Sequence, residues 1–486
     1  MKQIIILLSL VLLLCFSGNA QNDVDAYRYS SPGFGIGGRA LGMGTAYTAI
    51  ANDYSAIYWN PAGLGQIEMS EFSLGLSHLS FNNTSTFFKN QKSYSNSGTS
   101  LNSLGLVYPF PTVRGSLVFA AGYFRSNDFT TGLGYEAFNP RKSIIQLWAP
   151  DGYYQDTSKT KLLERLEGNL AWGLFLADTV SIGTNNFILR SPIIDNLMHG
   201  GTVLEDGGIN NWSIALASEP VKNLLMGLTL NIVTGSYNWT QTYTEKDVDN
   251  YYKTSPFDFD KLTINRWIEG ELSGFYAKFG FLYNIDNRTR VGFTLKTPTW
   301  LTIKEKFGDN LKSTFDNGDR FTYKFKDLQN EYDIVTHLVV TGGFSHIFGD
   351  FLVSADLEFT DWTQMEFRPV RDYLDLNQQI KDRFEPTVNL RVGFEYEISQ
   401  LGLRLRGGFA HIPSPYKGDP ASYNKKLITA GLGYIISDVV AIDLGYGYGF
   451  YDTFHTNTVD PDNIRVAVTD EQITTHNAII TLTYRF

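Results

Sequence analysis

The sequence feature that most constrains the fold is an alternation of two kinds of residue near the end of the chain. Between Val440 and Phe450 every second residue is large and apolar, and the residues between them are small or polar. A period of two predicts a β-strand with one apolar face. Residues 474–486 repeat the pattern and end on the aromatic Phe486. Such strands are typical of a transmembrane β-barrel, in which lipid-facing and lumen-facing side chains alternate.

The rest of the chain offers no helical route across a membrane. Beyond residues 1–20 there is no run of about 18 apolar residues, which a helical span needs. Only a closed barrel then satisfies every backbone polar group in lipid. Residues 1–20 combine a basic start, a long apolar run and small final residues, which predicts a signal peptide cut before Gln21. Cys15, the only cysteine, lies in this leader. Its lipidation is an alternative, although Leu14 stands where a small residue is expected.

Segments with the same alternation recur from residue 70 onward. Short turns such as Pro109–Thr112 and Ile285–Arg288 alternate strictly with long polar connections, as in barrels with short periplasmic turns and long external loops. We therefore predict an all-β, antiparallel transmembrane barrel of about 14 strands, with both termini on the periplasmic side. The predicted strands are 70–82, 101–110, 114–125, 208–218, 223–240, 266–284, 290–306, 334–346, 351–367, 387–398, 403–411, 426–435, 439–451 and 472–486.

The residues before the first strand predict a compact plug in the lumen. Gly33–Gly65 is rich in Gly and Ala, so a short helical segment there can approach another backbone closely. Asn60, Pro61 and Ala62 form a turn, because Pro61 fixes its own φ and disfavours the α region at Asn60. A G-x-G-x-x-G match in this stretch lacks the preceding strand that a dinucleotide site requires. The predicted divisions are a signal peptide at 1–20, a plug at 21–69 and a barrel at 70–486.

The residues GGRALGMGTAYTAIANDYSAIYWNPAGL resemble the N-terminal plug of the FadL family of outer-membrane transporters for long-chain fatty acids and other hydrophobic compounds. In that family an N-P-A turn, here Asn60, Pro61 and Ala62, follows a Gly/Ala-rich segment. The segments RVGFTLKTP, SADLEFTDWT and RGGFAHIPSP also resemble wall segments of the family, in the same order. The resemblance implies a plugged barrel in the cell outer membrane. The plug motif is also similar to that of related barrels that act as shuttles in type IX protein secretion.

Two functions follow from this resemblance. The first is passive uptake of hydrophobic small molecules (long-chain fatty acids, hydrocarbons or aromatics), by ligand capture at the external mouth and plug-gated passage. The second is a role as a partner or shuttle of a type IX secretion system. We expect a monomer that contacts outer-membrane lipid. The terminal Phe486 resembles the signal by which the barrel assembly machinery recognises its substrates.

Charged residues on the polar faces of the predicted strands point into the lumen. Their signs are mixed, so opposite charges on neighbouring strands can brace the wall and hold the plug. In an alternative interpretation, Arg404 and Arg406 bind a ligand carboxylate, since they lie about 7 Å apart on one face. The candidate lumen charges are Arg290, Lys296, Asp356, Glu358, Arg391, Arg404 and Arg406, with Lys278, Glu395, Asp443 and Arg485 on the same faces.

The longest connection, residues 126–207, far exceeds an ordinary loop and is predicted to be external and structured. Leucines recur in it at helical spacing, with charged residues between them. They predict either a helix that caps the barrel mouth or an external apolar groove that captures ligand. These leucines are Leu162, Leu163, Leu166, Leu170 and Leu174.

A charged, plugged lumen is a poor path for an apolar solute along its whole length, so we expect the solute to leave through a break in the wall. A break leaves strand hydrogen bonds unpaired and should therefore occur at a bulge or a glycine. Gly115 and Gly122, on the predicted third strand, are the candidates.

Composition and motifs argue against other functional classes. The formal net charge is -10 and no basic stripe is present, so the chain is a poor nucleic-acid binder. No G-x-S-x-G or H-E-x-x-H motif occurs, and we expect no enzyme activity. The acidic residues Asp247, Asp249, Asp258 and Asp260 lack the Gly and Glu of a calcium loop. We expect neither a metal nor a cofactor.

Overall fold

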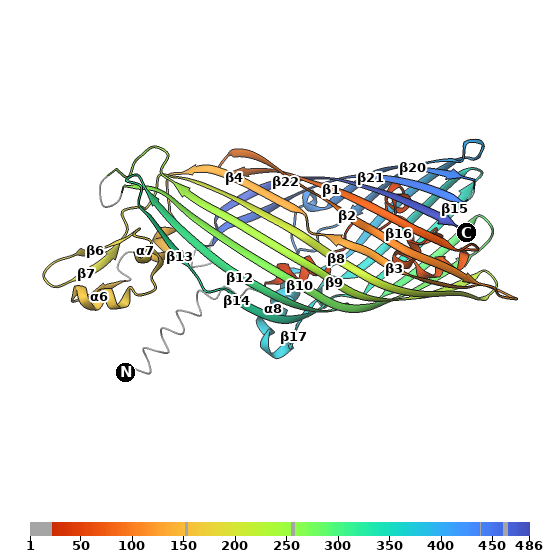
Figure 1. Ribbon diagram of the computed structural model, residues 1–486, viewed down its shortest axis with the longest axis horizontal. Helices are drawn as coiled ribbons and strands as arrows, with labels where there is room; N and C mark the ends of the chain where they lie inside the picture. The colour runs from red at the N-terminus through yellow and green to blue at the C-terminus, as the bar shows by residue number, and fades with distance from the viewer. Residues whose placement is uncertain (1–21, 151–153, 254–257, 438, 460–464) are drawn as a thin grey trace.

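The computed structural model describes residues 22–150, 154–253, 258–437, 439–459 and 465–486, so the predicted leader lies outside the described residues. The strands form a closed antiparallel barrel of 14 strands (Figure 1), which confirms the predicted fold. The first wall strand, β1 (Glu71–Phe87), pairs with the last, β22 (Arg465–Arg485), and this pairing closes the ring. Among the described residues, no helix is long and apolar enough to span a membrane.

Some wall strands are continuous and others are interrupted. Residues 290–306 were predicted as one strand, but the ladder stops at Pro298, which has no N–H to donate. The interrupted strands are β3 (Leu117–Asp128) with β4 (Thr131–Asn139), β11 (Thr289–Lys296) with β12 (Trp300–Phe315), β14 (Leu328–Val335) with β15 (Val339–Phe348), and β16 (Phe351–Asp361) with β17 (Glu366–Arg368). The others are β1, β2 (Asn90–Phe110), β8 (Leu197–Val221), β9 (Leu224–Lys246), β10 (Phe259–Asn284), β18 (Pro386–Ile398), β19 (Leu403–Ile412), β20 (Lys425–Ile436), β21 (Val440–Val459) and β22.

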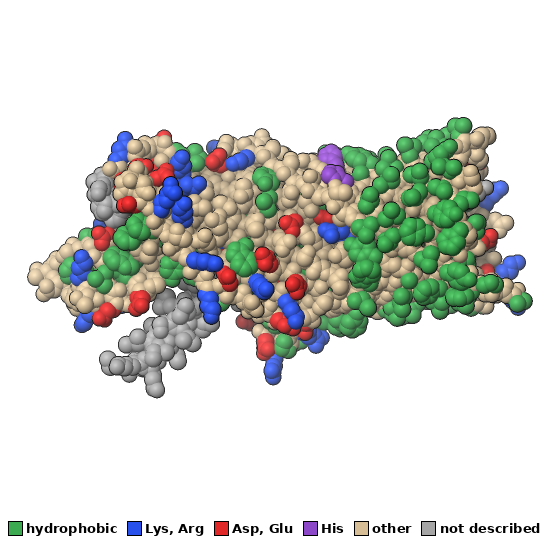
Figure 2. Space-filling model, in the orientation of Figure 1, with side chains coloured by type: hydrophobic (Ala, Val, Ile, Leu, Met, Phe, Trp, Pro, Cys, Tyr) green, Lys and Arg blue, Asp and Glu red, His purple; other side chains and the backbone are tan. Residues whose placement is uncertain are grey.

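The alternation places apolar side chains on the outside of one part of the barrel. Leu444, Tyr446, Leu482 and Tyr484 are all exposed there. Figure 2 shows these side chain types as a band at the end of the barrel that carries the short turns and the C-terminus. This apolar band is the surface that suits lipid. The wall continues far beyond it: β9 alone has 23 residues, and even when tilted by about 45° such a strand rises more than twice the roughly 25 Å of a lipid-facing band.

The segment before β1 lies inside the barrel (Figure 1). Residues 33–66, here called the plug body, include α3 (Gly38–Gly42), α4 (Ala56–Trp59) and η1 (Pro61–Gln66). The first of these helices contacts β19 to β22, and the last contacts β3 and β8 to β10, so the plug body touches opposite parts of the wall. A separate helix, α2 (Asp23–Ser30), begins with a capping box at Asn22. It lies farther from the short-turn end, about half-way along the barrel.

Glycines on the inner face of the wall make room for the plug body. A Cβ atom added to Gly343 would lie 2.8 Å from the Cβ of Thr48, and one added to Gly227 would lie 2.3 Å from the carbonyl carbon of Pro61. Both distances are shorter than real Cβ contacts. Gly342, the neighbour of Gly343 in the chain, has no heavy atom within 4 Å of such a Cβ. The small residues in the alternating pattern therefore mark the surface on which the plug body packs.

The long connection is more structured than predicted. Its first part is β4, which continues the wall by pairing with the start of β8, from Thr131↔Glu205 to Asn139↔Leu197. Its middle part forms a small head, which Figure 1 shows at the end of the barrel opposite the C-terminus. The head contains α5 (Ile145–Trp148), α6 (Lys159–Arg165), α7 (Leu170–Gly173) and a three-stranded sheet of β5 (Gln155–Asp156), β6 (Asp178–Ser181) and β7 (Phe187–Arg190).

The leucines of the head do not lie on one helix. The first helix ends at Arg165 and the next starts at Leu170, and between them Gly168 adopts a φ of 85°, which is incompatible with a continuous helix. Of the five leucines, Leu162, Leu166 and Leu174 are fully buried in a core that the head shares with the far ends of the wall strands, Leu170 packs against that core, and Leu163 is exposed. This packing favours the cap over the open groove.

The orientation of the barrel in the membrane can be tested with inserted epitopes. The β1–β2 hairpin turns at Phe88 and Lys89, far from the apolar band, whereas Val113 lies in the short turn between β2 and β3. We expect a tag after Lys89 to bind antibody on intact cells, and a tag after Val113 to bind only after the outer membrane is permeabilised. Labelling of the Val113 tag on intact cells would reverse the predicted topology.

Candidate functional site

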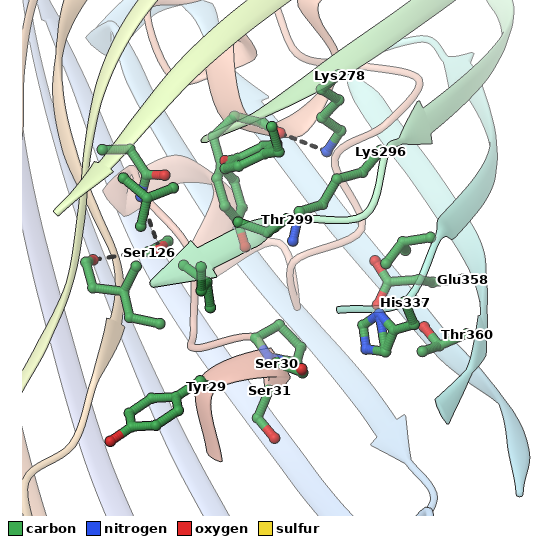
Figure 3. A pocket seen from close by; sticks show the side chains of 18 of the residues that line it. Tyr29, Ser30, Ser31, Ser126, Lys278, Lys296, Thr299, His337, Glu358 and Thr360 are labelled. Carbon is green, nitrogen blue, oxygen red and sulfur yellow. Dashed lines mark hydrogen bonds between the residues drawn. The ribbon is translucent and has the colours of Figure 1, made fainter. Parts of the chain in front are cut away.

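The candidate site is a cavity of about 90 Å³ in the lumen, between the plug body and α2 (Figure 3). Tyr58 of the plug body lines one side, and Tyr29, Ser30 and Ser31 at the end of α2 line another. The wall contributes apolar and polar side chains. These are Ser126, Ile209, Asn211, Val233, Tyr276, Lys278, Thr294, Lys296, Thr299, Leu301, His337, Val339, Thr341, Glu358 and Thr360.

The predicted plug motif anchors the plug body to the wall, on the side of the cavity nearer the short turns. Asn60 is fully buried, and its side-chain amide donates to the carbonyl oxygens of Thr48, at 2.8 Å, and of Phe281 on β10, at 3.1 Å. Its side-chain oxygen accepts from the N–H of Ala62 at 3.1 Å. Pro61 opens η1 at a position where an N–H would have no helical partner. The motif thus joins two parts of the plug body to one wall strand.

The other boundary of the cavity, α2, is held by charged contacts that sequence reasoning did not find. Asp23 pairs with Arg383 at 2.7 Å, and Arg28 approaches Glu205 on β8 at 3.9 Å. Arg383 ends α8 (Leu374–Arg383), a helix in the connection between β17 and β18. The hydroxyl of Tyr29 donates to Glu305 on β12 at 3.3 Å. Two wall strands, β8 and β12, and the helix α8 therefore hold this short helix over the cavity.

Burial raises the pKa values of two polar groups of α2. It raises the pKa of the Asp25 carboxyl above its usual range, although the adjacent Arg28 guanidinium acts in the opposite direction. It also raises the pKa of the Tyr29 hydroxyl well above its usual range. Both groups contact partners in the same cluster, so α2 is embedded in a polar network and not only in apolar contacts.

One carboxylate at the cavity is already neutralised by the protein. Glu358 receives two hydrogen bonds from the Arg391 guanidinium, at 2.6 and 3.1 Å, and a third from the Asn389 amide at 2.9 Å. A bidentate pair of this kind satisfies both charges. The hydrogen bonds that Glu358 accepts therefore come from Arg391, Asn389 and Thr341, and none comes from an amine.

Three basic side chains at the cavity are not neutralised in this way. Lys278 donates to the carbonyl oxygen of Tyr58 at 2.6 Å (Figure 3), and the Lys296 amine lies 4.8 Å from the centroid of the Tyr276 ring. Within the described part of the chain, neither amine has a carboxylate oxygen within 4.0 Å. His337 is 1% exposed, and its two ring nitrogens have no hydrogen-bond partner among the described residues. The cavity thus carries excess basic character.

Most of the remaining predicted lumen charges form a network around the plug body. Arg406 pairs with Glu395 and with Asp443, both at 2.6 Å, and Arg39 of the plug body also pairs with Glu395, at 2.8 Å. Asp356 accepts the N–H groups of Tyr47 and Thr48 of the plug body, each at 2.9 Å. Arg404 pairs with Glu397 at 3.0 Å, and Arg290 is half-buried on the inner face. Because Arg404 and Arg406 bind protein carboxylates, the geometry favours bracing of the wall and plug over the ligand-anchor alternative.

The candidate wall-break glycines do not lie at a break. Gly115 precedes β3, in the short turn, with a φ of 68° that only glycine adopts readily. Gly122 lies in an unbroken ladder, opposite Gly105 on one side and Ser213 on the other. A Cβ there would lie 2.3 Å from the hydroxyl of Tyr54, so this glycine serves to pack the plug body.

A discontinuity in the wall does occur farther along the same strand. The β2–β3 ladder ends at Ser103↔Phe124, while β3 continues to pair with β8 as far as Asp128, with a register shift between Arg125 and Asn127. Beyond this point the described ladders pair β2 only with β1, and β4 only with β8. Between the β1–β2 hairpin and β4, side-chain hydrogen bonds take the place of a backbone ladder. Four side chains donate to backbone oxygens of β4, namely Asn83, Ser85, Asn90 and Asn96.

The N-terminal segment borders this discontinuity. The N–H of Gly33 donates to the carbonyl oxygen of Ser126 at 3.2 Å, and the Asn127 amide donates to the carbonyl oxygen of Ser31 at 3.0 Å. Ser126 and Ser31 also line the cavity. The cavity, the wall discontinuity and the chain between α2 and the plug body therefore meet at one place.

Comparison with known proteins supports the architecture. The chain is similar to the Pseudomonas putida toluene transporter TodX, with a TM-score of 0.56 and 14% identity over 93% of this chain and 99% of that one. It is also similar to a Pseudomonas aeruginosa FadL homologue, with a TM-score of 0.54 and 12% identity over 94% of this chain and 98% of that one. At these identities the likeness shows the fold. No curated protein matches the chain.

The family assignment rests on the sequence of the wall. A family model described as outer membrane protein transport protein (OMPP1/FadL/TodX) matches residues 211–486, which is more than half of the chain. The match begins in β8 and runs to the last residue, so it includes the lumen charges and most of the cavity wall. The chain therefore belongs to the OMPP1/FadL/TodX family of outer-membrane transport proteins.

Proposed function

We propose that the protein is a passive outer-membrane channel for hydrophobic small molecules, and that its preferred solutes carry an acidic head group, as long-chain fatty acids do. The observation that carries the proposal is the basic character of the cavity at Lys296 and His337. The names of the similar solved structures, a toluene transporter and a FadL homologue, support a hydrophobic solute. Transport of this kind involves no chemical change in the solute.

The chemistry of the cavity suits an amphipathic acid. A buried cation without a counter-ion is costly, and a ligand carboxylate placed at Lys296 would supply one. His337 offers one ring N–H that can donate to the same carboxylate. An apolar tail would then contact the aliphatic part of the lining. This part consists of Ile209, Val233, Leu301 and Val339.

Passage through the cavity requires movement of the N-terminal segment. The cavity measures about 90 Å³, which is less than the roughly 150 Å³ of an engineered core cavity that binds benzene. A longer solute fits only if α2 or residues 31–33 shift. Displacement of residues 31–33 would also expose the wall discontinuity at Ser126, and we propose this as the lateral exit in place of Gly115 and Gly122.

Replacement of Lys296 by methionine tests the proposed head-group site. In cells that depend on this protein, Lys296→Met should lower uptake of a labelled long-chain fatty acid about tenfold, because a charge-assisted hydrogen bond contributes about 1.5–3 kcal/mol. Uptake of labelled toluene should change less than about twofold, since the side chain keeps most of its apolar stem.

The matched control is Lys304→Met, which removes an outward-facing amine that is 60% exposed and paired with Glu331. Both solutes should enter this variant as they enter the wild type. Equal loss of fatty acid and toluene uptake in Lys296→Met would exclude a head-group site. If neither solute enters faster with the wild-type protein than without it, and a secreted protein accumulates in the periplasm when the gene is deleted, the secretion alternative replaces the channel.

A further inference from the structure

A row of basic side chains lies on the outer surface, at the edge of the apolar band that faces away from the short turns. Each is two or four positions from an exposed apolar residue of the same strand and therefore shares its outward face. The pairs are His78 with Leu76, His411 with Phe409, Lys426 with Ile428, and His476 with Ala478 and Ile480 beyond it. Figure 2 shows histidine side chains against this edge of the band.

Strand register makes these residues neighbours. His411 of β19 lies directly opposite Lys426 of β20, and Lys426 lies opposite Phe450 of β21. His476 of β22 lies opposite Tyr448 of β21 and opposite Ser80 of β1, two positions on from His78 and on the same face. The residues form an arc across five adjacent strands, here called the basic arc. Its members are His78, His411, Lys426 and His476.

Two histidines of the arc, His476 and His78, are each held by one ring nitrogen. Nδ1 of His476 is 2.6 Å from the hydroxyl of Tyr446, and Nδ1 of His78 is 2.8 Å from the hydroxyl of Thr99. These bonds leave Nε2 of each ring for an outside partner. The Lys426 amine lies 5.8 Å from the centroid of the Phe450 ring, which fixes its stem along the wall.

We propose that the basic arc binds a phosphate group on the head group of an outer-leaflet lipid. Such a lipid places its acyl chains against the apolar band and its phosphate at the edge of that band, where the arc lies. A Lys or Arg at an anionic membrane surface contributes roughly fivefold to binding, and imidazole N–H groups add hydrogen bonds to phosphate oxygens.

The charge pattern around the arc fits this partner. The nearest outward acids on the same strands, Asp452 and Asp470, lie beyond Phe450 and Gln472, farther from the band, so they do not face a phosphate at its edge. On the other side of the barrel, Glu269 and Glu271 of β10 lie opposite Lys306 and Lys304 of β12, so the exposed bases there have acidic neighbours. The ladder partners of the basic arc are instead uncharged or basic, so its positive charge is not compensated in this way.

The test uses the mature full-length protein, purified in detergent and incubated with bisphosphorylated hexa-acylated lipid A. Retained lipid is measured by mass spectrometry after gel filtration. We expect the protein to retain at least about fivefold more of this lipid than of the same lipid with both phosphates removed. Lys426→Gln should lose about fivefold, and the triple variant His78→Gln/Lys426→Gln/His476→Gln should retain the two lipids equally.

Controls separate the arc from other surfaces. Lys304→Gln removes an exposed outward amine elsewhere on the wall and should retain lipid A like the wild type. Inorganic phosphate at millimolar concentration should compete poorly, because it has no acyl chains for the apolar band. Equal retention of lipid A by the wild type and the triple variant, with both folded by circular dichroism, would overturn the proposal. Displacement of the lipid by inorganic phosphate alone would also overturn it, since the ligand would then be free phosphate.

Discussion

Replacement of Gly343 by leucine should convert a closed barrel into a leaky one. A Cβ at this position would lie 2.5 Å from Oδ1 of Asp356 and 2.8 Å from the Cβ of Thr48, so a larger side chain forces the plug body away from the wall. It would also disturb the carboxylate that binds the N–H groups of Tyr47 and Thr48. Overpacking costs about 1–3 kcal/mol, which corresponds to a roughly 5- to 150-fold rise in the displaced population. Ion conductance in planar bilayers should rise in proportion.

The adjacent residue provides a matched control. Gly342 directly precedes Gly343 in the same strand, but nothing lies within 4 Å of a Cβ built on it. Gly342→Leu should therefore conduct like the wild type. If both variants fold, as judged by heat-modifiable migration in gels, and Gly343→Leu stays closed, the plug body does not block the lumen.

A disulfide between the N-terminal segment and the wall should stop transport. Ser31 and Asn127 are joined by a side-chain hydrogen bond of 3.0 Å, and the only cysteine, Cys15, lies in the predicted leader. We expect Ser31→Cys/Asn127→Cys to form a cross-link that holds residues 31–33 across the wall discontinuity. Uptake of fatty acid and toluene should then fall at least about tenfold under oxidising conditions, because the proposed passage needs this segment to move. Reduction should restore uptake.

The control disulfide joins two wall strands and leaves the N-terminal segment free to move. The hydroxyls of Ser77 and Ser100, on β1 and β2, are 3.0 Å apart. Ser77→Cys/Ser100→Cys should transport equally when oxidised and reduced. Full transport by the oxidised Ser31/Asn127 pair, with the cross-link verified by mass spectrometry, would place the passage elsewhere.

The parts of the fold that obey a simple period could be predicted from the sequence. The alternation from Val440 to Phe450 predicts correctly which residues of β21 face inward and which face outward. The same pattern, combined with the positions of the short turns, predicts the 14 strands of the barrel. Inner-facing charges such as Glu395 and Arg406 follow from the same parity. Their partners do not, because pairing depends on register between strands, which the pattern of one strand leaves open.

The parts that depend on contacts between distant segments could not be predicted. The alternation predicted one strand over residues 334–346, but the structure interrupts it between β14 and β15, and His337 lies in that interruption. The role of α2 rests on Asp23 and Arg383, which are far apart in the chain. The β2–β3 ladder ends where β4 pairs with β8 alone. Of the two glycines predicted as weak points, Gly122 packs against Tyr54 of the plug body and Gly115 forms the short turn before β3.

The glycine-lined inner face has a consequence for how the barrel is assembled. The ring closes only when β22, the last strand, pairs with β1, which directly follows the plug body in the chain. In the closed barrel the plug body lies among strands from the middle and the end of the sequence, because it contacts β8 to β10 and β19 to β22. A wall built around glycines has no side chains of its own to fill that space. The contacts of the plug body with these glycines therefore stabilise the closed ring, so the segment that fills the lumen also holds distant wall strands together.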